Sequence, residues 1–230
     1  FSAAMIEYWQ MSNWDRSIEL ASRAAKVYQD NGYGHLAANA IQLQAASIIE
    51  KANEVEKSDT SGLAPEVAVL FDEAINLFQQ ALATQQELGF DYDAAQITNN
   101  IGYSYYNMGD YENATRYYHE AAVSYRLARE WQEELVPLSN LAVIDVEQGR
   151  LIKAIKTFQR ILEILPADQL RHSSDTLGNL GVSQLTLGFP EDALRSFSSA
   201  LTIQEKIGDL SGQGRSLMGI GSTYYSTGKQ

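Results

Sequence analysis

The chain has 230 residues, of which 45% are hydrophobic, and its 17 basic and 29 acidic residues give a net charge of −12. This acidity opposes binding to nucleic acid or to an anionic membrane, because both are negatively charged. The sequence contains no cysteine, which excludes disulfides, thiolate catalysis and cysteine-ligated zinc.

The first helices that the sequence predicts lie in residues 13–28 and 71–82. In both segments small and apolar residues recur three and four positions apart, the spacing that forms one stripe along an α-helix. Ala74 and Phe78 of the second segment precede Ala114 and Tyr118 by 40 positions. These segments are therefore weaker copies of a pattern that is clearer further along the chain.

An insertion interrupts the pattern between these early copies and the later ones. Equivalent small residues lie 57 positions apart at Ala45 and Gly102, so seventeen extra residues must lie within the second copy. Residues 50–66 are the candidate, and they predict a prolonged, charged helix end followed by a polar loop near residues 58–65. The segment is either a protrusion that contacts a partner or, as we favour, a tolerated surface insertion, because loops accept added length at low entropic cost.

Four later segments recur at intervals of 40, 39 and 40 residues. Each contains a small residue that is followed seven positions later by glycine, and the first three continue with an alanine and then an aromatic residue. A fixed period of this length indicates stacked copies of one small unit rather than a single globular core. The segments are NNIGYSYYNMG (99–109), SNLAVIDVEQG (139–149), GNLGVSQLTLG (178–188) and MGIGSTYYSTG (218–228).

Each copy is predicted to form two antiparallel helices, A and B, joined by a tight turn. Gly109 and its counterparts suit a left-handed helix end, Asp110 suits an N-cap, and Pro190 suits the first turn of helix B. The small residues allow the two helices to approach closely. Gly181, for example, would face the aromatic ring of Phe197.

These motifs resemble the tetratricopeptide repeat, in a longer variant of about 40 residues rather than 34. The likeness is carried by NNIGYSYYNMGDYENATRYYHEAA, SNLAVIDVEQGRLIKAIKTFQRI and GNLGVSQLTLGFPEDALRSFSSAL, and it covers nearly the whole chain. The resemblance implies an all-α fold, a right-handed α-α superhelix of antiparallel helix hairpins. We expect one domain over residues 1–230 with about five and a half repeats: 1–31, 33–88 with the insertion, 91–129, 131–166, 170–207 and a partial 210–230.

The last copy stops at residues 228–230, where a second helix is expected to begin. Its helix A would expose an apolar face, whereas the terminal repeat of a complete array usually has a polar outer face. We therefore expect either that the chain is a segment of a longer protein or that a neighbouring molecule covers this end, which would permit self-association.

No motif indicates catalysis, a metal or another cofactor. The three histidines, His35, His119 and His172, have no second ligand at helical spacing. Residues 172–175 contain the residue types of a hydrolytic triad, but neighbours in sequence cannot form its geometry. Ser173 or Ser174 is a more natural helix N-cap. We expect a protein that is not an enzyme.

Helix A of each copy lines the concave side in proteins of this family, so the resemblance places a binding surface there. The candidate residues that share one face of these helices are Asn99, Tyr103, Tyr106, Val143, Val182 and Tyr225. For Val143 and Val182, packing between adjacent repeats is an equal alternative.

A polar feature also repeats on helix A, where Asn100, Asn140 and Asn179 lie two positions before the small residue. In kinesin light chains and Pins-type adaptors, asparagines in this place bind the backbone of an extended peptide. An amide suits that role because it donates and accepts hydrogen bonds at once. The alternative is that these amides bind neighbouring helix ends or water.

Two further observations qualify this surface. The groove positions carry no Lys or Arg, which disfavours the carboxylate clamp of the chaperone-binding members of the family. Asp145 and Gln184 replace a tyrosine that is usual in the family and is present here at Tyr105 and Tyr224. They mark either a polar contact point or a looser interface.

The first functional hypothesis is a protein-binding scaffold whose concave face takes an extended peptide or a partner's helix. The second is a regulatory segment of a larger protein, because similar arrays precede caspase-like proteases of the CHAT type and accompany bacterial transcription regulators. The expected partner is a protein or peptide, not nucleic acid or a membrane. No secretion signal or membrane-spanning run is visible, so we expect a cytoplasmic location, with the periplasm and secretion as alternatives.

Overall fold

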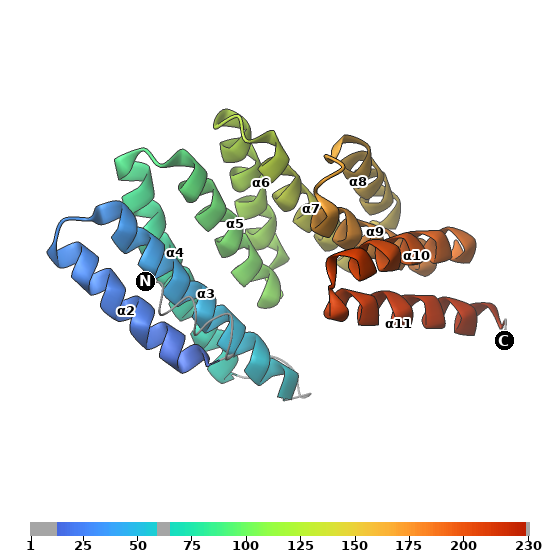
Figure 1. Ribbon diagram of the computed structural model, residues 1–230, viewed down its shortest axis with the longest axis horizontal. Helices are drawn as coiled ribbons and strands as arrows, with labels where there is room; N and C mark the ends of the chain where they lie inside the picture. The colour runs from blue at the N-terminus through green and yellow to red at the C-terminus, as the bar shows by residue number, and fades with distance from the viewer. Residues whose placement is uncertain (1–12, 59–64, 229–230) are drawn as a thin grey trace. The chain divides into compact units, whose positions relative to one another are not determined.

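The computed structural model describes residues 13–58 and 65–228, and all regular secondary structure in these residues is α-helix (Figure 1). The prediction of an all-α fold built from helix hairpins is therefore confirmed. The chain divides into two compact units, Phe1–Glu130 and Trp131–Gln230. Each unit is a stack of helices in which successive helices contact one another.

The described helices of the first unit are α2 (Trp14–Asp30), α3 (Gly34–Ser58), α4 (Pro65–Leu88), α5 (Asp91–Asn107) and α6 (Tyr111–Leu127). Their core contains the fully buried rings of Phe71 and Phe78. Helix α3 has 25 residues and α4 has 24, so much of the segment expected as an insertion is helical. The predicted polar loop near 58–65 falls largely on residues 59–64, which lie outside the described residues.

The helices of the second unit are α7 (Trp131–Glu147), α8 (Leu151–Ile164), α9 (Leu170–Thr186), α10 (Pro190–Ile207) and α11 (Leu210–Thr227). Ala142, Ala154, Phe158 and Leu180 form a buried cluster that joins α7, α8 and α9. Helix α10 contacts both α9 and α11. The unit thus alternates A and B helices, and the A helices are α7, α9 and α11.

The ends of the A helices have the predicted geometry. Gly109, Gly149, Gly188 and Gly228 all have positive φ angles, between 64° and 88°, a region that favours glycine because it has no Cβ. Asp110 caps α6 by accepting a hydrogen bond from the Asn113 amide at 3.1 Å.

The predicted cap at the start of α9 is wrong. The helix begins at Leu170 with Gln169 in the N-cap position, one turn earlier than expected. Ser174 is consequently inside the helix, where it is fully buried and its hydroxyl donates to the Arg171 carbonyl at 2.8 Å. A serine can satisfy its own hydroxyl in this way without marking a helix end.

The small residues face aromatic rings, as their spacing predicts. A Cβ added at Gly181 would lie 2.8 Å from Cδ1 and Cε1 of Phe197, and one added at Gly102 would lie 2.8 Å from Cδ1 of Tyr118. Phe197 also meets α11, because a Cβ added at Gly219 would lie 2.6 Å from its Cε1. The Phe197 ring is therefore held between α9 and α11.

Asp145 and Gln184, which replace the usual tyrosine, both make polar contacts. The Asp145 side chain is 4% exposed and forms ion pairs with Arg150 at 2.6 Å and Lys153 at 3.1 Å. Gln184 accepts a hydrogen bond from the buried Ser196 hydroxyl at 2.7 Å. These contacts join the A helix of each repeat to the turn or helix that follows it.

Candidate functional site

The first pocket of the candidate site lies between α7 and α9, and its volume is about 360 Å³. Asn140 from α7 and Asn179 from α9 both line it, so the structure brings together two of the three predicted asparagines. They are one repeat apart in the sequence. The other lining residues are Gln132, Glu133, Val136, Ser139, Gln169, Arg171, His172 and Asp175.

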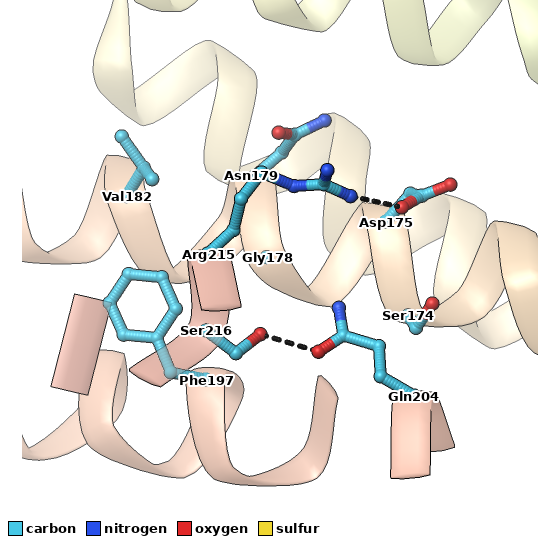
Figure 2. Close-up of a pocket in the computed structure, with 9 residues that line it drawn as sticks. All are labelled: Ser174, Asp175, Gly178, Asn179, Val182, Phe197, Gln204, Arg215 and Ser216. Carbon is cyan, nitrogen blue, oxygen red and sulfur yellow. Dashed lines mark hydrogen bonds and ion pairs between the residues drawn. The ribbon is translucent and has the colours of Figure 1, made fainter. Parts of the chain in front are cut away.

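A second pocket of about 250 Å³ continues the first toward α11, and the two share Asp175 and Asn179. Figure 2 shows the residues that line this second pocket, with Val182 on α9 and Phe197 on α10 near one side of it. At its base the Ser216 hydroxyl donates to the side-chain oxygen of Gln204 at 2.8 Å. We call the surface formed by the two pockets the α7–α9–α11 face.

Ion pairs link the repeats along this face. Arg215 lies 3.6 Å from Asp175 (Figure 2), and Arg171 lies 3.4 Å from Asp209, the N-cap of α11. Partial burial raises the pKa of the Asp175 carboxyl above its usual range, and the neighbouring Arg215 opposes this shift. The face therefore offers both donors and acceptors from charged side chains beside the two amides.

His172 lines the first pocket without a charge partner. Burial lowers the pKa of its imidazole below the usual value, which favours the neutral ring at pH 7. Its Nε2 atom is buried and makes no hydrogen bond within the described chain.

The remaining asparagine and the neighbouring candidates lie on α5 of the first unit. Asn99 and Asn100 are half-buried, and Tyr103 is exposed. The ring of Tyr106 lies 5.8 Å from that of Tyr111 on α6. These residues form a polar and aromatic stripe within the first unit.

The aliphatic and aromatic candidates of the second unit have different surroundings. Val143 is half-buried and packs against the α7–α8–α9 cluster, which matches the packing alternative. Val182 is 47% exposed and lines the second pocket, whereas Tyr225 is 91% exposed and lines neither pocket.

Four charged residues of this face lie outside the positions that the sequence predicts: Glu133, Arg171, Asp175 and Arg215. The predicted positions do lack Lys and Arg, but the lining of the pockets extends further toward the helix N-termini. Arg171, Asp175 and Asn179 are spaced four apart on α9, so they share one face of the helix. Extending the predicted stripe by two turns would have found them.

Within residues 13–58 and 65–228, no three His, Asp or Glu side chains are grouped so that they could hold a metal ion. None of the helices in this part of the chain has the length and hydropathy needed to cross a bilayer.

Comparison with known proteins agrees with this architecture. Residues 93–167 match the family model of the tetratricopeptide repeat, which confirms the resemblance inferred from the sequence. Residues 93–167 therefore contain tetratricopeptide repeats, and the other described helices form hairpins of the same kind. No curated protein matches the sequence.

Three solved structures show the same fold. Aspartyl phosphate phosphatase F from Bacillus subtilis is 19% identical, with a TM-score of 0.65 over 88% of this chain and 50% of that protein. A Rap protein complexed with competence and sporulation factor is 15% identical, with a TM-score of 0.62 over 100% of this chain and 64% of that protein. A signal transduction ATPase with a tetratricopeptide repeat sensor, from Pyrococcus horikoshii, is 16% identical, with a TM-score of 0.61 over 95% of this chain and 34% of that protein. The chain thus spans between a third and two thirds of these three proteins.

Proposed function

We propose that this protein is a non-enzymatic interaction module that binds an extended peptide segment of a partner along the α7–α9–α11 face. The observation that carries the proposal is the placement of Asn140 and Asn179 in one pocket, at equivalent positions of successive repeats. The Asn179 side chain makes no hydrogen bond within the described chain. Its amide can therefore donate to and accept from a peptide group.

Geometry supports an extended ligand. Helices α7 and α9 are in contact, and packed helices lie about 8–10 Å apart. An extended chain advances about 3.3 Å per residue. The two asparagines would therefore bind peptide groups about three residues apart, and the intervening side chains would point into the two pockets.

The charged residues add selectivity to this backbone recognition. The Arg171 and Arg215 side chains are largely exposed, and their salt bridges to Asp209 and Asp175 are 3.4 and 3.6 Å long. Salt bridges of exposed side chains are weak. A partner with a charged side chain can replace such a contact at little cost. The Rap protein described as complexed with competence and sporulation factor has the same fold, which supports the same type of function.

The experiment is selection of binding peptides from a random dodecapeptide library, followed by measurement of dissociation constants by fluorescence anisotropy. We expect the paired substitution Asn140→Ala and Asn179→Ala to weaken binding at least tenfold, because two backbone contacts are lost. Gln159→Ala, an exposed amide on α8, is the control and should leave binding unchanged. Equal affinity of the double variant, with helicity intact by circular dichroism, would exclude the amides as the binding device.

A second candidate function is that of a sensor segment in a larger signalling protein. It is favoured by the fold shared with the Pyrococcus ATPase, in which a tetratricopeptide array is described as the sensor. In that case a caspase-like protease or a DNA-binding domain would supply the activity outside these residues. A domain of either kind after Gln230 in the natural protein would favour this candidate, whereas further repeats alone would favour the scaffold.

We also propose that the outer face of α11 is covered by a second copy of the chain. Leu217 and Met218 on this helix are largely exposed. Gly221, the equivalent of Gly102 and Gly181, has no atom within 4 Å of an added Cβ. The place that an aromatic ring occupies in the other repeats is therefore open.

A further inference from the structure

A third pocket in the second unit belongs to a different surface. It has a volume of about 580 Å³ and lies between α7 and α8. Leu135, Leu138 and Ile161 supply apolar groups to it. None of its lining residues lines the α7–α9–α11 face, so its ligand would not compete with a peptide bound there. We call it the α7–α8 groove.

Helix α8 leaves an apolar side chain exposed near each of its ends, in addition to the stripe that it buries. Ala154 and Phe158 are fully buried against the neighbouring helices. Ile152 and Ile164, which line the α7–α8 groove, are 61% and 38% exposed. Exposed aliphatic side chains that line the same groove are typical of a contact surface.

The rim of the groove is basic in a protein that is otherwise acidic. Lys153, Lys156 and Arg160 line it, and no acidic residue does. Lys153 is paired with Asp145 and Arg160 with Glu163, whereas Lys156 forms no salt bridge within the described chain. Lys156 is therefore the cation of this rim that has no acidic partner, and in a chain with a net charge of −12 it favours an anionic ligand.

We propose that the α7–α8 groove binds an acidic amphipathic helix of a partner protein. A groove with an apolar floor between two helices accepts the apolar stripe of a third helix. Helix α8 has 14 residues, so at 1.5 Å per residue the groove can follow a partner helix for about four turns. Acidic side chains beside that stripe would meet Lys156 and Arg160 at the rim.

An anionic membrane also carries negative charge, but it fits the α7–α8 groove less well than a helix does. A bilayer is flat on this scale and cannot fill a concave groove, whereas a helix can. The net negative charge of the chain also repels an anionic bilayer over distances up to about the Debye length, roughly 8 Å at physiological salt. A single helix presents its charges only at the rim and avoids most of this repulsion.

The test uses the whole chain and two synthetic 16-residue helices that share one leucine stripe. One helix has glutamate beside the stripe and the other has lysine. Fluorescence anisotropy should show micromolar binding of the glutamate helix, weakened by added salt, and at least tenfold weaker binding of the lysine helix. Lys156→Glu should weaken binding of the glutamate helix at least fivefold, and Ile152→Ser should weaken it at all salt concentrations.

Controls separate this site from the others. Lys206→Glu, an exposed lysine on α10, should leave binding of the glutamate helix unchanged, as should the paired Asn140→Ala and Asn179→Ala substitution. The proposal is overturned if the two synthetic helices bind equally or if Lys156→Glu has no effect. It is also overturned if vesicles of phosphatidylcholine and phosphatidylserine compete with the glutamate helix, or if the chain is a dimer that Lys156→Glu converts to a monomer.

Discussion

Substitution of Gly181 by alanine tests the close packing of A and B helices on which the fold depends. A Cβ at this position would lie 2.8 Å from two carbons of the Phe197 ring, closer than carbon atoms normally approach. The ring is 3% exposed and is confined on its other side by Gly219 of α11. It cannot move away without displacing a helix, so overpacking should cost about 1–3 kcal/mol.

The same substitution also has a smaller, stabilising effect through helix propensity, which must be separated from the cost of overpacking. Alanine is favoured over glycine inside a helix by about 1 kcal/mol. Gly178 on the same helix and Gly221 at the equivalent position of α11 provide the correction, because nothing lies within 4 Å of a Cβ added at either. Gly178→Ala and Gly221→Ala should therefore stabilise the protein by up to about 1 kcal/mol.

The measurement is the free energy of unfolding from urea titrations followed by circular dichroism. Gly181→Ala should be less stable than Gly178→Ala by about 1–3 kcal/mol, and combining Gly181→Ala with Phe197→Leu should recover about 1 kcal/mol of the loss. Equal stability of the three glycine variants would refute the packing of Phe197 against Gly181.

Two other predictions follow from the second unit. Because burial lowers the pKa of His172, the unfolded chain binds a proton there more readily than the folded chain. The contribution of His172 to the free energy of unfolding should therefore be constant above about pH 6.5 and fall as the pH drops below that value. In urea titrations at pH 7.5, 6.0 and 5.0, His172→Gln should make this decline shallower. If a second copy covers α11, the sedimentation coefficient of the protein should rise with protein concentration. Leu217→Glu should abolish this rise, because it places a charge on the exposed apolar face. A sedimentation coefficient that is independent of concentration would exclude self-association.

Much of the repeat structure could be predicted from the sequence because backbone geometry and close packing restrict residue type. A left-handed turn favours glycine, which located the ends of the A helices at Gly109, Gly149 and Gly188. Close helix contact requires a small residue opposite a ring, which identified the pair Gly181 and Phe197. These restrictions act on single positions and recur in every copy, so a fixed period reveals them.

The candidate site was less predictable because its residues differ between repeats. Asp175 and Arg215 pair across two helices, and no local pattern marks either residue as a partner of the other. Asp145 departs from the family pattern, but its ion pairs depend on how Arg150 and Lys153 lie in the folded chain. The start of α9 was misplaced because a buried serine that bonds within the helix has the same residue type as an N-cap.

The measurement that tests the central claim most directly follows the side-chain amides of Asn140 and Asn179 by NMR. A selected dodecapeptide is added to the ¹⁵N-labelled protein, with the signals assigned by comparison with Asn140→Ala and Asn179→Ala. We predict that both pairs of NH₂ signals shift and that their protons exchange more slowly with water, while those of Gln159 do not change. A saturating peptide that leaves both asparagine signals unaltered would show that the partner binds elsewhere.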